Sequence, residues 1–127
     1  MRRSDTLAPD MTQPATSDGA SFVADLLAEA PIPARGIHSQ TMSNADGVEL
    51  VLFAFAPGEQ LSEHTSARPA IIHILAGEAT VTVDGIERAA AAGTWLRMAA
   101  RSPHAIVART GLVMALYLLP VPAASAG

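Results

Sequence analysis

The stretch PGEQLSEHTSARPAIIHILAGEATVTVDG, residues 57–85, decides the fold of this chain. It contains two short apolar runs, 70–75 and 79–83, and the second leads directly into the dipeptide Asp84-Gly85. An Asp-Gly pair after a run rich in Val and Thr is typical of a two-residue β-hairpin turn. The stretch therefore predicts consecutive antiparallel strands with no helix between them.

Apolar runs of strand length continue on both sides of this stretch, and turn residues separate them. They are residues 48–55, 86–89, 94–98, 104–108 and 112–119. Short strands at this spacing indicate an antiparallel sandwich or barrel. Because the 127 residues suffice for one core and contain no internal repeat, we predict a single all-β domain.

The two ends of the chain differ in composition from this centre. Residues 1–19 are rich in Ser, Thr, Asp and Pro and contain few large apolar groups, so they cannot offset the entropy lost on ordering. We therefore predict a disordered leader over 1–19, a β-barrel domain over 20–120 and a flexible tail over 121–127.

A short helix is predicted at the start of the domain. Ser21 is a suitable N-cap, and Phe22, Leu26 and Leu27 would share one face of the helix. The helix is expected to end before Pro31.

Two of the predicted strands are apolar on both faces. In residues 51–56 and 113–119 neither alternate set of side chains is polar, and a strand of this kind must be covered on both sides. One face can line the barrel interior. The other requires a second sheet, the N-terminal helix, another subunit or a single long lid segment. Among these we expect another subunit, and hence a homodimer.

Composition excludes several classes of function. With eight Arg, no Lys and a net charge of −4, the chain lacks the basic surface that nucleic acid binding requires. It has no Cys, which excludes disulfides, thiolate metal ligands and cysteine nucleophiles. No apolar stretch is long enough to span a bilayer, and no apolar segment follows Arg2 and Arg3 as in a secretory signal. We therefore expect a cytoplasmic protein with neither a nucleic acid nor a membrane partner.

Two histidines stand at characteristic distances from glycines. Five residues separate Gly58 from His64, and ten separate Gly93 from His104. These spacings resemble the two sequence motifs of the cupin family, and with the strand pattern the resemblance covers residues 48–119. It implies an antiparallel double-stranded β-helix, also called a jelly-roll barrel, in a short single-domain member.

The same resemblance implies a metal site that is degenerate here. Cupins typically hold iron, manganese, nickel or zinc with three His and one Glu. In this chain Ser66 stands at the second His position and Ala70 at the Glu position, so that only His64 and His104 remain. Two imidazoles leave a divalent ion mostly coordinated by water. The predicted ligands are therefore His64 and His104, for one divalent transition metal (Fe, Mn, Ni, Cu or Zn).

Two residues, His73 and His38, are candidates for a third metal ligand. Strand alternation places Ala70 inside the barrel and therefore His73 outside it, unless a bulge between them reverses the alternation. His38 lies on a possible early strand, and nothing in the sequence places it near the site.

By the same resemblance the predicted ligand pocket comprises His64, Ser66, Met98, Arg101 and His104. Without a metal, a neutral imidazole inside an apolar barrel can act as a general base or accept a hydrogen bond from a ligand. Arg97 and Arg101 are candidate anion-binding residues, and Arg101 is the better candidate because it lies in the loop before His104.

The sequence therefore predicts a small-molecule-binding cupin of unassigned substrate. The alternative is a metal-dependent enzyme of the dioxygenase or isomerase type that uses His64, His104 and an unidentified third ligand. A purely structural dimer is the least favoured hypothesis, because the two histidines would then need another explanation.

Overall fold

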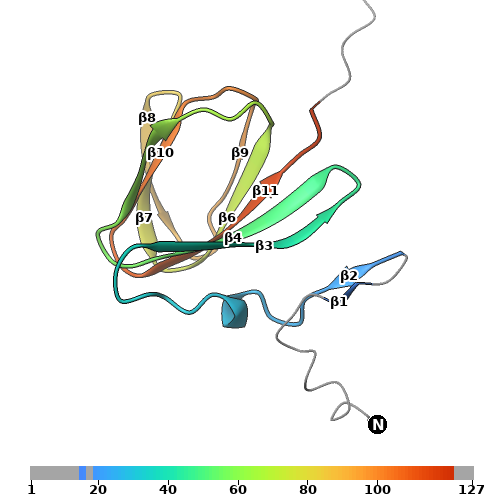
Figure 1. Cartoon of the computed structure of the whole chain (residues 1–127). Coiled ribbons are helices and arrows are strands. Elements are labelled where there is room, and N and C mark those ends of the chain that lie inside the picture. The colour runs from blue at the N-terminus through green and yellow to red at the C-terminus, as the bar shows by residue number, and fades with distance from the viewer. Residues whose placement is uncertain (1–14, 17–18, 122–127) are drawn as a thin grey trace, which may run out of the picture.

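Two antiparallel sheets packed face to face form the molecule (Figure 1). The structure, a computed structural model, describes residues 15–16 and 19–121. A four-stranded sheet has the order β5-β10-β7-β8, a five-stranded sheet has the order β3-β4-β11-β6-β9, and β1 and β2 pair separately. The strands are β1 Ala15–Thr16, β2 Ser21–Phe22, β3 Ile37–Ala45, β4 Val48–Phe55, β5 Gln60–His64, β6 Ala70–Ala76, β7 Glu78–Val83, β8 Ile86–Ala91, β9 Trp95–Met98, β10 His104–Ala108 and β11 Leu112–Leu118. The all-β jelly-roll architecture predicted from the sequence is confirmed.

Every strand predicted from an apolar run is present, with ends that differ by at most two residues. Besides the two-residue strands β1 and β2, two strands were not predicted with definite bounds, β3 and β5. Both are edge strands, and most of their side chains are exposed, so they carry little of the apolar alternation that marks a strand in the sequence.

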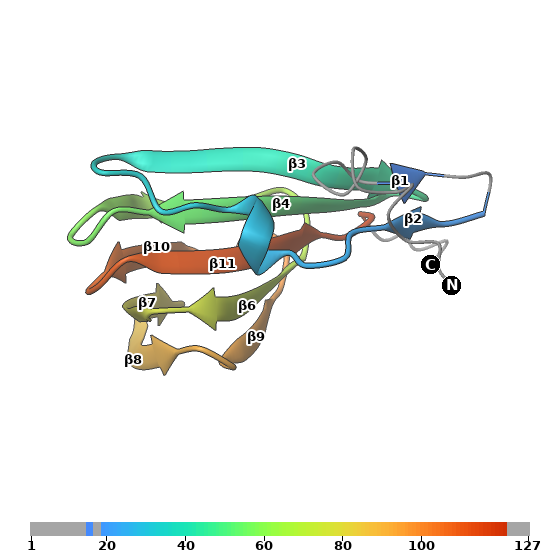
Figure 2. The ribbon, with the colours of Figure 1, turned by 90° about the horizontal axis from the view of Figure 1, so that it is seen from below.

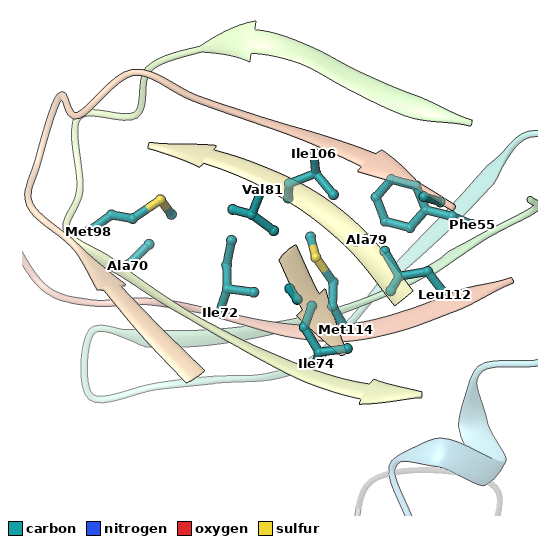
Figure 3. Close-up of a cluster of buried hydrophobic side chains, with 12 residues drawn as sticks. Phe55, Ala70, Ile72, Ile74, Ala79, Val81, Met98, Ile106, Leu112 and Met114 are labelled. Atoms are coloured by element: carbon teal, nitrogen blue, oxygen red, sulfur yellow. The ribbon is translucent and has the colours of Figure 1, made fainter. Parts of the chain in front are cut away.

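The main core fills the space between the two sheets (Figure 3). Alternate residues of β6 point into it, as strand alternation predicts: Ala70, Ile72 and Ile74 are buried. Ile106 reaches the core from β10 and Met114 reaches it from β11. The interior near the predicted site is therefore apolar.

A second cluster covers the outer face of β4 and β11. Leu52 and Ala54 of β4 and Val113 and Ala115 of β11 are buried there, together with Ala30 of the N-terminal segment. Figure 2 shows this segment crossing the outer face of the five-stranded sheet. The two apolar faces of β4 and β11 are therefore both covered. The four-stranded sheet packs on the inner face, and the N-terminal segment packs on the outer face. The homodimer stays a prediction.

The short N-terminal helix is a single 3-10 turn, Leu27–Glu29. It does not begin at Ser21, which lies in β2 and pairs with Thr16. The side chain of Asp25 instead accepts hydrogen bonds from the backbone N–H groups of Leu27 and Ala28. The segment before Pro31 is too short for an α-helix to be stable without extensive packing.

The predicted leader and tail lie mostly outside the described residues, namely at 1–14, 17–18 and 122–127. Within the described part of the chain, no helix has the length and apolar character needed to cross a membrane.

Candidate functional site

Two histidines from neighbouring strands lie against each other at one end of the four-stranded sheet. His64 is the last residue of β5 and His104 is the first of β10, and they are directly opposite in the antiparallel pairing. Their ring centroids are 4.2 Å apart, and the ring planes make an angle of 62°. The structure therefore brings together the two histidines that the motif spacings selected.

An irregularity in β5 sets the direction of His64. His64 pairs with His104 whereas Leu61 pairs with Ile106, so that three steps along β5 match two steps along β10. An extra residue in one strand of a pair changes which face its side chains occupy. Leu61 and His64 consequently both lie on the inner face of the sheet, where Leu61 packs against the main core.

The backbone fixes the tautomer of both rings in the same way. Nδ1 of His64 lies 2.8 Å from the carbonyl oxygen of Ser62, and Nδ1 of His104 lies 2.9 Å from that of Ser102. A carbonyl oxygen only accepts hydrogen bonds, so Nδ1 carries the proton in each neutral ring. Each Nε2 is then left with a lone pair, and the site presents two acceptors side by side.

The pair stands at the rim of the sandwich. His104 is only 7% exposed, whereas His64 is exposed. Across the four-stranded sheet, Val83 pairs with His104 and Ile86 pairs with Val83. These four residues form one row along the end of the inner face, with the imidazoles at one side and aliphatic groups at the other. A ligand at the histidines therefore has an apolar neighbour within the same row.

Met98 approaches from the opposite sheet. It is buried in the main core and is directly opposite Ala70 in the pairing of β6 with β9. Its thioether therefore contributes apolar surface to the interior.

Ser66 and Arg101 are joined through the backbone rather than through their functional groups. The N–H of Arg101 donates to the carbonyl oxygen of Ser66 at 2.7 Å, and the Ser66 hydroxyl accepts from the N–H of Arg68. Arg101 has a φ of 68°, a left-handed conformation that favours Gly. Its side chain is exposed. Arg101 thus lies in the loop that leads to His104.

The donor set does not fit the four-ligand metal of the resemblance. Ala70, at the Glu position, is 2% exposed and offers no donor, and Ser66 uses its hydroxyl in a turn. His73 lies on the outer face, opposite Ala115 of the outer cluster. His38 is likewise on the outer face and lines a hollow of about 390 Å³ beneath the N-terminal segment. Among the described residues no group of three His, Cys, Asp or Glu side chains could hold a metal ion.

Arg68 holds the loop after β5 in place, and the sequence analysis did not predict this role. Its guanidinium donates to the carbonyl oxygens of Leu119, Leu118 and Gly47 at 2.9, 3.1 and 2.6 Å, and it pairs with the Glu49 carboxylate at 3.4 Å. These contacts tie the loop after His64 to the ends of β11 and β4. No sequence signal could have found them, because all four partners are remote in sequence and three are backbone atoms.

Comparison with known proteins agrees with this geometry. The family model described as a cupin domain matches residues 51–119. A conserved protein of unknown function from Streptococcus pyogenes is 28% identical with a TM-score of 0.72, over 80% of this chain and 90% of that one. A cupin superfamily protein from Desulfitobacterium hafniense is 26% identical with a TM-score of 0.72, over 78% and 91% of the two chains. An RmlC-like cupin from Shewanella frigidimarina, 21% identical with a TM-score of 0.65 over 74% and 84%, shares the fold. No curated protein matches the chain.

Proposed function

Because the chain belongs to the cupin family, we propose that it is a small-molecule-binding cupin whose ligand is held at His64 and His104. The observation that supports this most strongly is the matched arrangement of the two rings, in which both Nδ1 atoms are committed to backbone carbonyls. Both Nε2 atoms are therefore acceptors in the neutral state. A site with two adjacent acceptors and apolar walls favours a ligand that carries two neighbouring O–H or N–H donors.

The apolar surroundings add to this preference. A hydrogen bond inside a partly desolvated site is stronger than the same bond in water, because the local dielectric constant is lower. Val83, directly opposite His104 in the pairing of β7 with β10, supplies apolar surface near the rings, and His104 is nearly excluded from solvent. A neutral imidazole in this position can also take a proton from a bound hydroxyl, which makes general-base chemistry compatible with the site.

The alternative is a metal-dependent cupin enzyme. The same two Nε2 lone pairs favour it, because a ligating His commonly donates its other N–H to a carbonyl. The chain would supply two ligands, and a divalent ion would keep several waters. Elemental analysis of the purified protein distinguishes the two hypotheses. About one transition metal per chain, lost in a His64→Ala/His104→Ala variant, would replace the proposed function with this one.

The binding proposal is tested with donor-bearing probes on protein treated with a chelator. Catechol and cyclohexane-1,2-diol offer two neighbouring O–H donors, and 1,2-dimethoxybenzene has a related shape without them. We expect the first two to raise the melting temperature in a saturable way, and the ether to have no such effect.

Outer-face histidines provide matched control variants. The rise should disappear in His64→Ala and in His104→Ala, and it should persist in His38→Ala and His73→Ala, whose side chains lie on the outer face of the other sheet. Equal loss in all four variants, or no loss in the first two, would contradict a site at the histidine pair.

We also propose that the protein is a cytoplasmic homodimer. The outer face of β6 carries Ile71 and His73, and it adjoins the part of the sheet that the N-terminal segment covers. Light scattering combined with size-exclusion chromatography measures the oligomeric state. A monomer at every accessible concentration would refute the dimer.

A further inference from the structure

A cleft lies where the two sheets end side by side. β8 is an edge strand of the four-stranded sheet and β9 is an edge strand of the five-stranded sheet. Between them lies a cavity of about 270 Å³. The residues that line it include two aliphatic side chains of β7, most of β8 and the whole of β9 except Met98.

The walls of the cleft are largely apolar. Val83 and Leu96 pack against the main core from the two sheets, and Ile86 is 53% exposed beside Val83. Trp95 lines the same cavity and is 59% exposed. Large apolar groups left open around a cavity are a common feature of small-molecule sites.

Two arginines supply positive charge to this cavity. Arg88 is directly opposite the buried Val81, so its side chain leaves β8 on the inner face of the sheet. Arg97 lines the cavity from β9, where it is directly opposite Ile71 on the outer side of β6. In the part of the chain that the structure describes, the one ion pair is between Arg68 and Glu49, so neither of these arginines has a carboxylate partner.

The nearest acid in sequence does not neutralise them. Glu87 precedes Arg88 in the strand and is therefore on the opposite face, where it pairs with Thr82. The protein has a net charge of −4, so its overall field does not attract anions. Any attraction for an anion must come from the two guanidinium groups themselves.

We propose that this cleft binds a small carboxylate that carries an apolar body. Guanidinium groups match a carboxylate in charge and in hydrogen-bond geometry, and the apolar body would contact Trp95, Ile86 and Leu96. The site is separate from the histidine pair. Val83 and Ile86 border both, but the arginines belong to β8 and β9, whereas the histidines belong to β5 and β10.

Trp95 provides a direct readout because it is the only Trp in the chain. Cyclohexanecarboxylate and hexanoate do not absorb in the range used to excite indole, so each can be titrated while Trp95 fluorescence is followed. The neutral amides of both acids are matched controls, and sodium chloride matches ionic strength. We expect a saturable change with the carboxylates and none with the amides or the salt, and weaker binding as salt is raised.

Charge-removing variants locate the binding. Arg88→Gln and Arg97→Gln should each weaken binding about three- to fivefold, the range for one partly exposed ion pair. Arg109→Gln removes an equal charge from an exposed site outside the cavity and should leave binding unchanged. Circular dichroism checks that each variant is folded.

Several outcomes would overturn this proposal. They are no saturable change with either acid below about 10 mM, equal binding of the amides, or an equal effect of Arg109→Gln. The His64→Ala/His104→Ala variant separates the two proposals, because its cleft should bind the acids normally. Loss of carboxylate binding in that variant would assign the carboxylate to the histidine pair instead.

Discussion

Replacing Arg68 with Ala should destabilise the protein more than any other single loss of charge among the described residues. Its guanidinium connects three elements that are far apart in sequence: the loop after β5, the hairpin between β3 and β4, and the end of β11. The substitution removes donors from the carbonyl oxygens of Leu119, Leu118 and Gly47, and it removes the charge opposite Glu49.

The magnitude follows from the partners and their exposure. A hydrogen bond to a charged group contributes about 1.5–3 kcal/mol to stability, and a partly exposed ion pair contributes at most about 1 kcal/mol. The Arg68 side chain is 29% exposed, so water can reach some of the orphaned oxygens and the contributions do not add in full. We therefore expect a loss of about 3 kcal/mol, which lowers the melting temperature of a domain of this size by about 10 °C.

Urea denaturation measures this loss as a change in midpoint at constant slope. Arg109→Ala is the matched control, since Arg109 is exposed and has no side-chain hydrogen bond among those that the structure describes. Arg68→Lys should recover only part of the stability, because one ammonium group cannot reproduce the planar fork of donors. A loss in Arg68→Ala no greater than in Arg109→Ala would refute the role assigned to these contacts.

Three further predictions concern the loops and rings around the site. Arg101→Gly should stabilise the protein by about 1 kcal/mol in urea denaturation, since Arg101 has a φ of 68° and Gly adopts this conformation without a steric cost; a loss of stability would show that the Arg101 side chain makes a favourable contact. Gly77→Ala should lower the free energy of unfolding by at least about 3 kcal/mol or prevent folding, because the added Cβ would clash with the carbonyl oxygen of Gly111 and the φ of Gly77 is 90°. Near-normal stability in urea denaturation would mean that this turn differs from the one described. In ¹⁵N NMR, the neutral rings of His64 and His104 should both carry their proton on Nδ1 and none on Nε2; a proton on Nε2 of either neutral ring would contradict the proposed pair of acceptors.

Much of the fold could be predicted because the buried strands are apolar runs in the sequence. The strands β4, β6 and β11 are apolar runs, and each buries side chains against the core. The edge strands β3 and β5 could not be bounded in this way, since a strand that is exposed needs no apolar pattern. Their positions depend on pairing with β4 and β10, which is a property of the whole sheet.

The candidate site could likewise be predicted only in part. The spacings to Gly58 and Gly93 selected His64 and His104, and strand alternation placed His73 on the outer face. The bulge in β5 was not predictable, although it decides that His64 shares a face with Leu61. Arg88 gave no signal either. Its position in the cleft depends on the register between β7 and β8 and on the approach of a strand from the other sheet.

The pattern of differences from the cupin motifs has a physical explanation that connects the fold to the proposed function. A Glu at position 70 would lie in the apolar interior between Ile72 and Met98, and an ionised carboxylate buried there without a metal is strongly unfavourable. Ala70 avoids that cost. An imidazole, in contrast, can be neutral, and here a backbone carbonyl accepts the proton-bearing nitrogen of each ring. The two positions that keep a histidine are thus those at which the side chain is tolerated without a metal. Position 70, where a carboxylate would require a metal, holds a methyl group. This combination favours a site that works through hydrogen bonds to a small molecule.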